Sequence, residues 1–383
     1  MNISPFKIAI PQKELKDLQD RIKHTRWPEG ISGEGWKRGM PLEYTQKLAE
    51  YWRSKYDWRE QEATLNKYPQ FMTEIDGQKI HFVHVRSSKP DAMPLLLCHG
   101  YPSSFVEFIP LINRLVAPVT SGDASAQAFH VIIPSLPGFG FSTPVLYPGW
   151  EITKMAKAFI QLMSELGYDR YGIHGGDVGA GICTQLCIQA GESIIGSLIP
   201  TDPGAIATEY TPPTHHLSDE EKKRHEQLKA ARREDFGYIQ IQSTRPQTIA
   251  YSLTDSPVGQ MAWIVEKYKE WTDAARELPE DAVDIDQLLT NVSVYWFGRG
   301  GASAAHFLYE AAHAAPSWGE MHNRPQGFVV FGYEPLVRRI LDPEQTLTYW
   351  NEHDRGGHFP AMEAPDLLIG DLRSFFQQLH SAA

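Results

Sequence analysis

Short apolar runs separated by helical segments recur along the chain. Residues 94–98, 129–134 and 171–174 have the length and composition of buried parallel strands, and each run precedes loop or helical residues. A further strand-like run at 193–200 continues the alternation, and an Asp-Gly turn within the alternating segment 75–85 predicts a hairpin at the entry to the sheet. This order predicts an α/β fold with a mostly parallel, doubly wound sheet.

Two long segments depart from this alternation. The first ninety or so residues indicate helices broken by Gly/Pro turns, and the stretch from about 208 to 324 carries long amphipathic helices, including 219–233, 258–271 and 302–312. Strand-like runs return at 327–333 and 346–349, and a closing helix is expected at 366–379. The sequence therefore predicts an N-terminal helical extension at 1–90, a core at 91–207 and 326–383, and an inserted helical cap at 208–325.

The charge balance excludes two classes of partner. The chain has 36 Lys and Arg against 47 Asp and Glu, a formal net charge of −11, which would repel nucleic acid and an anionic membrane surface. Its 3 cysteines are too few for a disulfide framework, and Cys183 and Cys187 are expected to be buried apolar side chains rather than metal ligands. No signal peptide or membrane anchor is visible. We therefore expect a cytoplasmic protein that uses no metal and no other cofactor.

The motif Gly175-Gly176-Asp177-Val178-Gly179 follows a predicted strand and opens a predicted helix. This context is typical of the nucleophile elbow of α/β-hydrolases, with Asp177 in the nucleophile position. Glycines suit the tight, strained turn, and the N-terminal dipole of the following helix favours an ionised carboxylate. Taken alone, the motif is equally compatible with an ordinary loop in which Asp177 caps a helix.

A second motif, His-Gly-Tyr-Pro at 99–102, directly follows the strand-like run at 94–98. In this position an α/β-hydrolase supplies one backbone donor of its oxyanion hole, which here would be the N–H of Tyr101. The second donor is expected to be the N–H of Val178, immediately after the nucleophile. The two motifs must then meet at the carboxyl ends of neighbouring strands.

The general base is expected near the C-terminus, because the chain order in this fold is nucleophile, acid, histidine. His358 stands on a Gly-Gly loop between the last strand-like run and the closing helix, and it is the candidate base. Glu334, which directly follows the run at 328–333, is the candidate acid that would orient the imidazole. The alternatives are Asp202, after an earlier strand, and Asp354, on the histidine loop.

With these three motifs the chain resembles the microsomal-type epoxide hydrolases along nearly its whole length. Residues 6–28, which end in Thr-Arg-Trp-Pro, are similar to the N-terminal extension of that family. The segment Gly-Tyr-Ile-Gln-Ile-Gln-Ser-Thr-Arg-Pro at 237–246 is similar to its cap signature. The resemblance implies an α/β-hydrolase fold with an N-terminal extension and an inserted helical cap.

The resemblance also implies two cap tyrosines that hold and protonate the epoxide oxygen. The matching positions are Tyr238, in the Gly-Tyr-Ile-Gln segment, and Tyr309, in Phe-Leu-Tyr-Glu. The alternative interpretation is that Tyr238 and Tyr309 are both core aromatic residues, and Tyr251 and Tyr295 are nearby competitors.

The activity implied is hydrolysis of an epoxide to a vicinal diol through a covalent ester on Asp177, with water activated by His358 and no cofactor. The partners would be a small apolar epoxide and water, and the family suggests a homodimer and a role in detoxification. Val178 and Tyr101 depart from the family, which often carries tryptophan at both positions, so the substrate preferences of relatives are not carried over. The alternatives are a haloalkane dehalogenase, which usually has tryptophan beside its nucleophile, and a non-catalytic ligand-binding homologue.

Overall fold

The computed structural model describes residues 2–117, 126–200, 217–223, 226, 236–315, 321–332, 338, 342 and 344–382. Within these residues the strands form one sheet in the order β1-β2-β3-β5-β4-β6-β7-β8-β9. The pairs that join β1, β2, β3 and β5 are antiparallel, and all pairs from β5 to β9 are parallel. The predicted mostly parallel sheet is confirmed. The strands are β1 (Ser4–Phe6), β2 (Gln70–Ile75), β3 (Gln78–Val85), β4 (Met93–Cys98), β5 (Phe129–Pro134), β6 (Tyr171–Gly175), β7 (Ile194–Pro200), β8 (Gln326–Val330) and β9 (Tyr349–Glu352).

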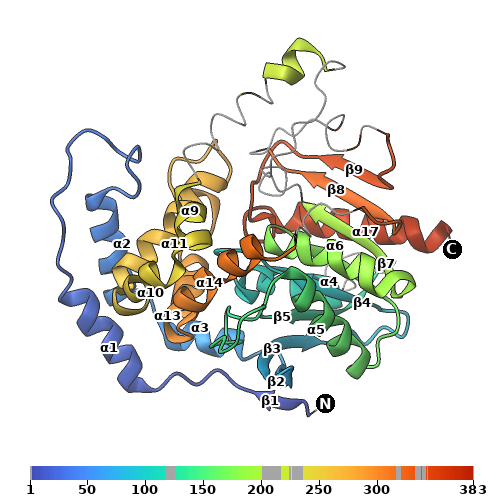
Figure 1. Ribbon diagram of the computed structural model, residues 1–383, viewed down its shortest axis with the longest axis horizontal. Coiled ribbons are helices and arrows are strands. Elements are labelled where there is room, and N and C mark those ends of the chain that lie inside the picture. The colour runs from blue at the N-terminus through green and yellow to red at the C-terminus, as the bar shows by residue number, and fades with distance from the viewer. Residues whose placement is uncertain are drawn as a thin grey trace.

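The central strands are apolar on both faces. β4 reads Met-Pro-Leu-Leu-Leu-Cys and β5 reads Phe-His-Val-Ile-Ile-Pro, and their leucine and isoleucine side chains are fully buried. Such strands need a helical layer on each side. The helices α5 (Ile152–Glu165) and α6 (Val178–Ala190) cover one face, and α4 (Ile109–Val116) and α17 (Pro365–Ala382) cover the other (Figure 1).

The cap helices lie beside the sheet, coloured yellow to orange in Figure 1. The N-terminal helices pack against the cap helices: Trp52 Nε1 donates to Ser293 Oγ at 2.9 Å, and the Tyr51 hydroxyl donates to Asp286 at 3.0 Å. In the described ranges no helix has both the length and the apolar character needed to cross a bilayer. The N-terminal helices are α1 (Gln12–Lys23), α2 (Leu42–Ser54) and α3 (Trp58–Leu65), and those of the cap are α9 (Gly237–Thr244), α10 (Pro246–Asp255), α11 (Pro257–Trp271), α12 (Pro279–Ala282), α13 (Ile285–Phe297) and α14 (Gly300–His313).

Three short helices complete the described elements: η1 (Phe105–Phe108), η3 (Gly191–Ser193) and α16 (Pro360–Glu363). Most predicted elements agree with the structure to within a few residues. The expected hairpin joins β2 to β3 through Asp76 and Gly77, whose φ angles of 50° and 76° fit an Asp-Gly turn. The helix predicted at 219–233 falls within the described part of the chain only at 219–223 and 226.

Two strands differ from the prediction. β1 is missing from it, because this strand is three residues long, partly exposed, and paired only with β2 at the edge of the sheet, so it leaves no apolar run. The last strand begins at Tyr349 rather than near residue 346. The backbone N–H groups of Thr346 and Leu347 donate instead to Asp342 Oδ1 at 2.6 and 3.3 Å, which removes them from pairing with β8.

Candidate active site

Asp177 stands at the turn between β6 and α6, where the parallel strand ends. Its backbone has φ 52° and ψ −126°, a conformation that residues with a side chain rarely adopt, so the turn is strained. A Cβ on Gly179 would lie 2.1 Å from the carbonyl oxygen of Cys98, so only glycine fits there. The carboxyl group also lies at the N-terminus of α6, whose dipole favours the ionised form. These features are the ones expected of a nucleophile elbow.

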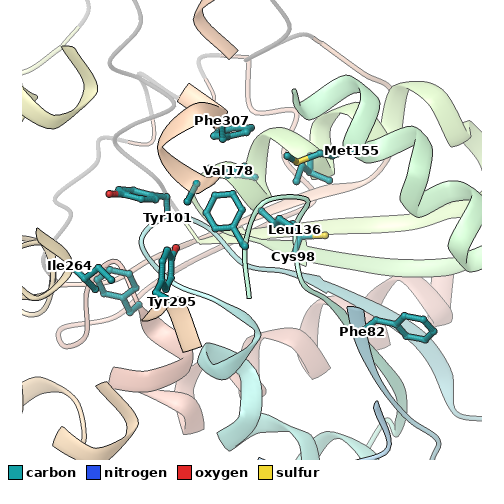
Figure 2. Close-up of a cluster of buried hydrophobic side chains, with 14 of the residues drawn as sticks. Phe82, Cys98, Tyr101, Leu136, Met155, Val178, Ile264, Tyr295 and Phe307 are labelled. Atoms are coloured by element: carbon teal, nitrogen blue, oxygen red, sulfur yellow. The ribbon is translucent and has the colours of Figure 1, made fainter. Parts of the chain in front are cut away.

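The His-Gly-Tyr-Pro loop meets this elbow. β4 and β6 are parallel neighbours with Cys98 opposite Gly175, so the loops that follow them leave the same edge of the sheet. The backbone N–H of Tyr101 donates to Asp177 Oδ1 at 2.7 Å. Val178, the first residue of α6, is buried close to Tyr101 in the apolar cluster that Figure 2 shows. One oxygen of the carboxylate therefore already accepts a hydrogen bond from the first predicted oxyanion donor.

His358 reaches the same carboxylate from the C-terminal part of the chain. Its Nε2 lies 3.9 Å from Asp177 Oδ2, and the two side chains are 9% and 18% exposed. The backbone N–H of His358 donates to the carbonyl oxygen of Trp271 at 2.9 Å, and the two rings lie 4.9 Å apart. The C-terminal end of the cap helix α11 thus holds the histidine near the nucleophile.

The two cap tyrosines differ in their surroundings. The ring of Tyr238 stacks on Tyr101 at 5.7 Å and lies 5.6 Å from the ring of Trp271, so it bridges the oxyanion loop and the residue that holds His358. The buried ammonium group of Lys267 lies 5.0 Å from the Tyr238 ring centre. Tyr309, on α14, is 36% exposed, and its ring stacks on His313 at 4.0 Å. Tyr238 thus contacts residues that lie against Asp177 and His358, whereas the ring of Tyr309 contacts His313.

The competing tyrosines have other partners. The exposed Tyr251 lies on α10, and the hydroxyl of the buried Tyr295 donates to the carbonyl oxygen of Ser103 at 2.8 Å. Of the candidate acids, Glu334 and Asp202 lie outside the described residues, whereas Asp354 is exposed. In the described part of the chain, no three His, Cys, Asp or Glu side chains gather as a metal site would require.

Comparison with known proteins places this geometry in a family. The model for the epoxide hydrolase N terminus matches residues 3–108, and the model for the alpha/beta hydrolase fold matches residues 93–355. A putative epoxide hydrolase of Stigmatella aurantiaca is 45% identical over 99% of this chain and 86% of that protein, and epoxide hydrolase 1 of Sus scrofa is 33% identical over 98% and 88%. The chain belongs to the epoxide hydrolase family. The structure of the Aspergillus niger epoxide hydrolase is similar to this epoxide hydrolase with a TM-score of 0.86, 32% identity, and coverage of 99% of this chain and 97% of that one.

The predicted α/β-hydrolase fold and epoxide hydrolase activity are confirmed by these relatives. A second solved structure, the juvenile hormone epoxide hydrolase of the silkworm Bombyx mori, is 29% identical with a TM-score of 0.85 and covers 99% of this chain and 94% of that one. The likeness extends over the N-terminal helices, the cap and the sheet together. The similarity to epoxide hydrolases therefore covers the whole chain and is not limited to the α/β core.

Sequence reasoning missed two carboxyl groups of this epoxide hydrolase. Glu107, on η1, is buried, and burial raises its pKa to about 8, while a hydrogen bond from Ser103 lowers it and the charge of Asp177 raises it. Desolvation raises the pKa of Glu363, on α16, to about 7, although backbone N–H groups, that of Asp273 first, lower it. Glu107 could have been noticed as a lone carboxyl in Phe-Val-Glu-Phe, and Glu363 as an acid in the first turn after a proline. Neither pattern reveals what the carboxyl group contacts.

Proposed function

We propose that this epoxide hydrolase works through a covalent ester between Asp177 and the substrate, which His358 then hydrolyses. The main support for this proposal is a pair of contacts made by the Asp177 carboxylate. Its Oδ1 accepts the Tyr101 N–H at 2.7 Å, and its Oδ2 lies 3.9 Å from His358 Nε2. Oδ1 is thereby committed to a backbone donor. Oδ2 is the oxygen that attacks, and Oδ1 becomes the carbonyl oxygen of the ester.

In the first step Oδ2 of Asp177 forms a bond to one epoxide carbon as the bond from that carbon to the ring oxygen breaks. A carboxylate suits this chemistry because it is already ionised at neutral pH and needs no base. The released oxygen becomes basic as the ring opens, and it takes a proton from a phenol of the cap. Tyr238 and Tyr309 are the proposed donors, and the position of Tyr238 between Tyr101 and Trp271 supports its part in this.

In the second step His358 takes a proton from water while the water oxygen attacks the ester carbonyl carbon of Asp177. The backbone N–H groups of Tyr101 and Val178 stabilise the tetrahedral oxyanion. Cleavage of the ester bond releases the diol, which carries the former Oδ2 and takes the proton from His358. The carboxylic acid left at Asp177 loses its proton, and the phenolate of the cap regains one.

The surroundings of His358 support its role as base. Its backbone N–H satisfies a carbonyl at the C-terminus of α11, and its ring lies beside Trp271. Both contacts hold the imidazole close to Asp177, where a general base for the second step is needed. Glu334 is the proposed acid that orients the imidazole.

A small apolar epoxide is the proposed substrate class. Buried apolar side chains surround the elbow, among them Val178 and Phe307, which Figure 2 shows in one cluster with Tyr101. Val178 and Tyr101 replace two tryptophans that are common in the family, so we expect the pocket to have its own shape and substrate range. The homodimer, the cytoplasmic location and the division at residues 90, 207 and 325 stay predictions.

The deciding experiment measures diol formation from a panel of aliphatic and aryl epoxides. We expect Asp177→Ala to abolish turnover, and His358→Gln to accumulate a protein adduct whose mass equals enzyme plus epoxide. In a single native turnover in ¹⁸O-labelled water, the diol should carry unlabelled oxygen and Asp177 should gain the label. Turnover that survives in Asp177→Ala, or label that goes directly into the first diol, would contradict the mechanism. Release of bromide from a bromoalkane, which we do not expect, would favour the haloalkane alternative.

A further inference from the structure

The loop that carries His358 is bound to the end of cap helix α11 by hydrogen bonds that backbone N–H groups of the loop donate. The N–H of His358 donates to Trp271 O at 2.9 Å, and the N–H of Gly356 donates to Asp273 Oδ2 at 3.3 Å. A Cβ on Gly357 would lie 2.7 Å from Trp271 O, so the loop backbone lies directly against the helix end. The cap and the histidine loop are therefore one packed unit.

Glu363 joins the two sides of this unit with one carboxylate. Its Oε1 accepts the N–H of Phe359 at 2.9 Å, and its Oε2 accepts the N–H of Asp273 at 2.8 Å. Phe359 directly follows His358, and Asp273 lies just beyond the last residue of α11. The carboxylate thus bridges the residue next to the histidine and Asp273, two residues beyond the end of the cap helix.

A purely local role does not account for this bridge. Glu363 ends the short helix α16, and a side chain that capped this helix would need only the bond to Phe359 at its start. The second bond reaches Asp273, which is far from α16 in the sequence. The loop also contacts α11 through the ring of Phe359, which stacks on Tyr268 with 4.1 Å between the ring centres. Both oxygens are used to fix the histidine loop relative to the cap.

We propose that Glu363 is a positioning residue that holds His358 at the correct distance from the ester on Asp177. This inference rests on the proposed function, because it requires His358 to act in the second step. Displacement of a reacting group by about 1 Å can slow a reaction about a hundredfold. Attack by Asp177 on the epoxide needs neither Glu363 nor the histidine, so the two half-reactions should respond differently.

The test is Glu363→Gln, followed by rapid quenching and mass spectrometry during a single turnover. Glutamine keeps the shape and one acceptor oxygen, but its NH₂ group must face one of the two backbone N–H donors, so one of the two bonds is lost. We expect ester formation within twofold of the native rate, ester hydrolysis at least tenfold slower, and an accumulated adduct. The matched control is Glu62→Gln, which removes another carboxylate that accepts a backbone N–H, that of Ile10 at 2.7 Å, in the N-terminal extension. It should leave both half-reactions unchanged.

Equal slowing of both half-reactions, or native ester hydrolysis in Glu363→Gln, would overturn the inference while leaving the proposed mechanism intact. Absence of any ester in the native enzyme would instead refute the mechanism and the inference together. If Glu363→Gln does not fold, Glu363→Asp tests the same bridge, because a side chain one methylene shorter cannot reach both the Phe359 and the Asp273 N–H groups. It should slow ester hydrolysis selectively, and unchanged partition of the two steps in that variant would refute the inference.

Discussion

Asp177 and His358 lie 3.9 Å apart, yet different parts of the molecule hold them in place. The aspartate is fixed by the sheet: two parallel neighbouring strands end beside each other, and a backbone N–H of the loop after β4 contacts the carboxylate. The histidine stands on a loop that owes its position to the cap, through Trp271, Asp273 and Glu363. Of the two proposed catalytic groups, Asp177 belongs to the core, whereas the position of His358 depends on an insertion.

This difference suggests how the family can change substrates while keeping its chemistry. Changes in the cap should act on the loop of His358 as well, because this loop is bound to the end of α11. Changes beside Asp177 are restricted, because a Cβ on Gly100 would meet the Asp177 side chain and a Cβ on Gly179 would meet the carbonyl oxygen of Cys98. The comparison leads to predictions that separate core effects from cap effects.

The largest effect is expected on the core side, for Gly179→Ala. The new Cβ would lie 2.1 Å from a backbone carbonyl oxygen, and neither the sheet nor α6 can move away without displacing the elbow. We expect a loss of more than about a thousandfold in diol formation and destabilisation of several kcal/mol, measured by activity and thermal unfolding. The control is Gly370→Ala on α17, where nothing lies within 4 Å of the new Cβ and native activity should remain. A stable, active Gly179→Ala would show that the elbow is not rigid.

The same contrast explains what the sequence could predict. β4, β5 and β6 were predictable because each is a local apolar run, and their order in the sheet brings the two motifs together. β1 was not, since its place depends on pairing with a strand far away in the chain. Local patterns thus predict the core of the fold and the meeting of the two motifs, but not the edge of the sheet.

On the cap side, sequence predicts residue types better than it predicts orientation. Neighbouring helix positions differ by about 100° in direction, so a motif such as Phe-Leu-Tyr-Glu cannot say which side chain faces the site. In the structure Phe307 of this motif is buried, whereas Tyr309 is 36% exposed. Glu363 was missed for a related reason, since its partner Asp273 comes from an element distant in sequence.

An intermediate effect is expected for Tyr238→Phe. Loss of one phenol donor to the opening epoxide should slow ester formation about ten- to a hundredfold and leave ester hydrolysis unchanged, the reverse of the pattern for Glu363→Gln. Single-turnover measurements of both steps test this, with the exposed Tyr251→Phe as the control. Tyr309→Phe should lose less activity than Tyr238→Phe, because its ring stacks on His313. Slower hydrolysis with native ester formation in Tyr238→Phe would contradict its role as donor.

The smallest effect on catalysis, but a clear one on stability, is expected for Glu107→Gln. Burial raises the pKa of Glu107 to about 8 in the folded protein, well above its ordinary value of 4.5. The folded state therefore holds a proton that the unfolded chain releases, so this contribution to stability is present below about pH 4.5 and is lost as pH rises through about 8. Glutamine has no such proton, so the variant should gain stability relative to the native protein by a few kcal/mol, to order of magnitude, between these limits.

Urea unfolding of the two proteins at pH 5, 6, 7 and 8 measures this difference directly. The contribution of Glu363 is present in both proteins and cancels, so the changing gap between the two curves reports Glu107 alone. Glu74→Gln, at an exposed position of β2, serves as the control and should run parallel to the native protein. Parallel curves for Glu107→Gln would mean that this carboxyl group ionises normally beside Asp177, so that the core side of the site tolerates a second negative charge. A widening gap would mean that the core keeps Glu107 neutral beside Asp177.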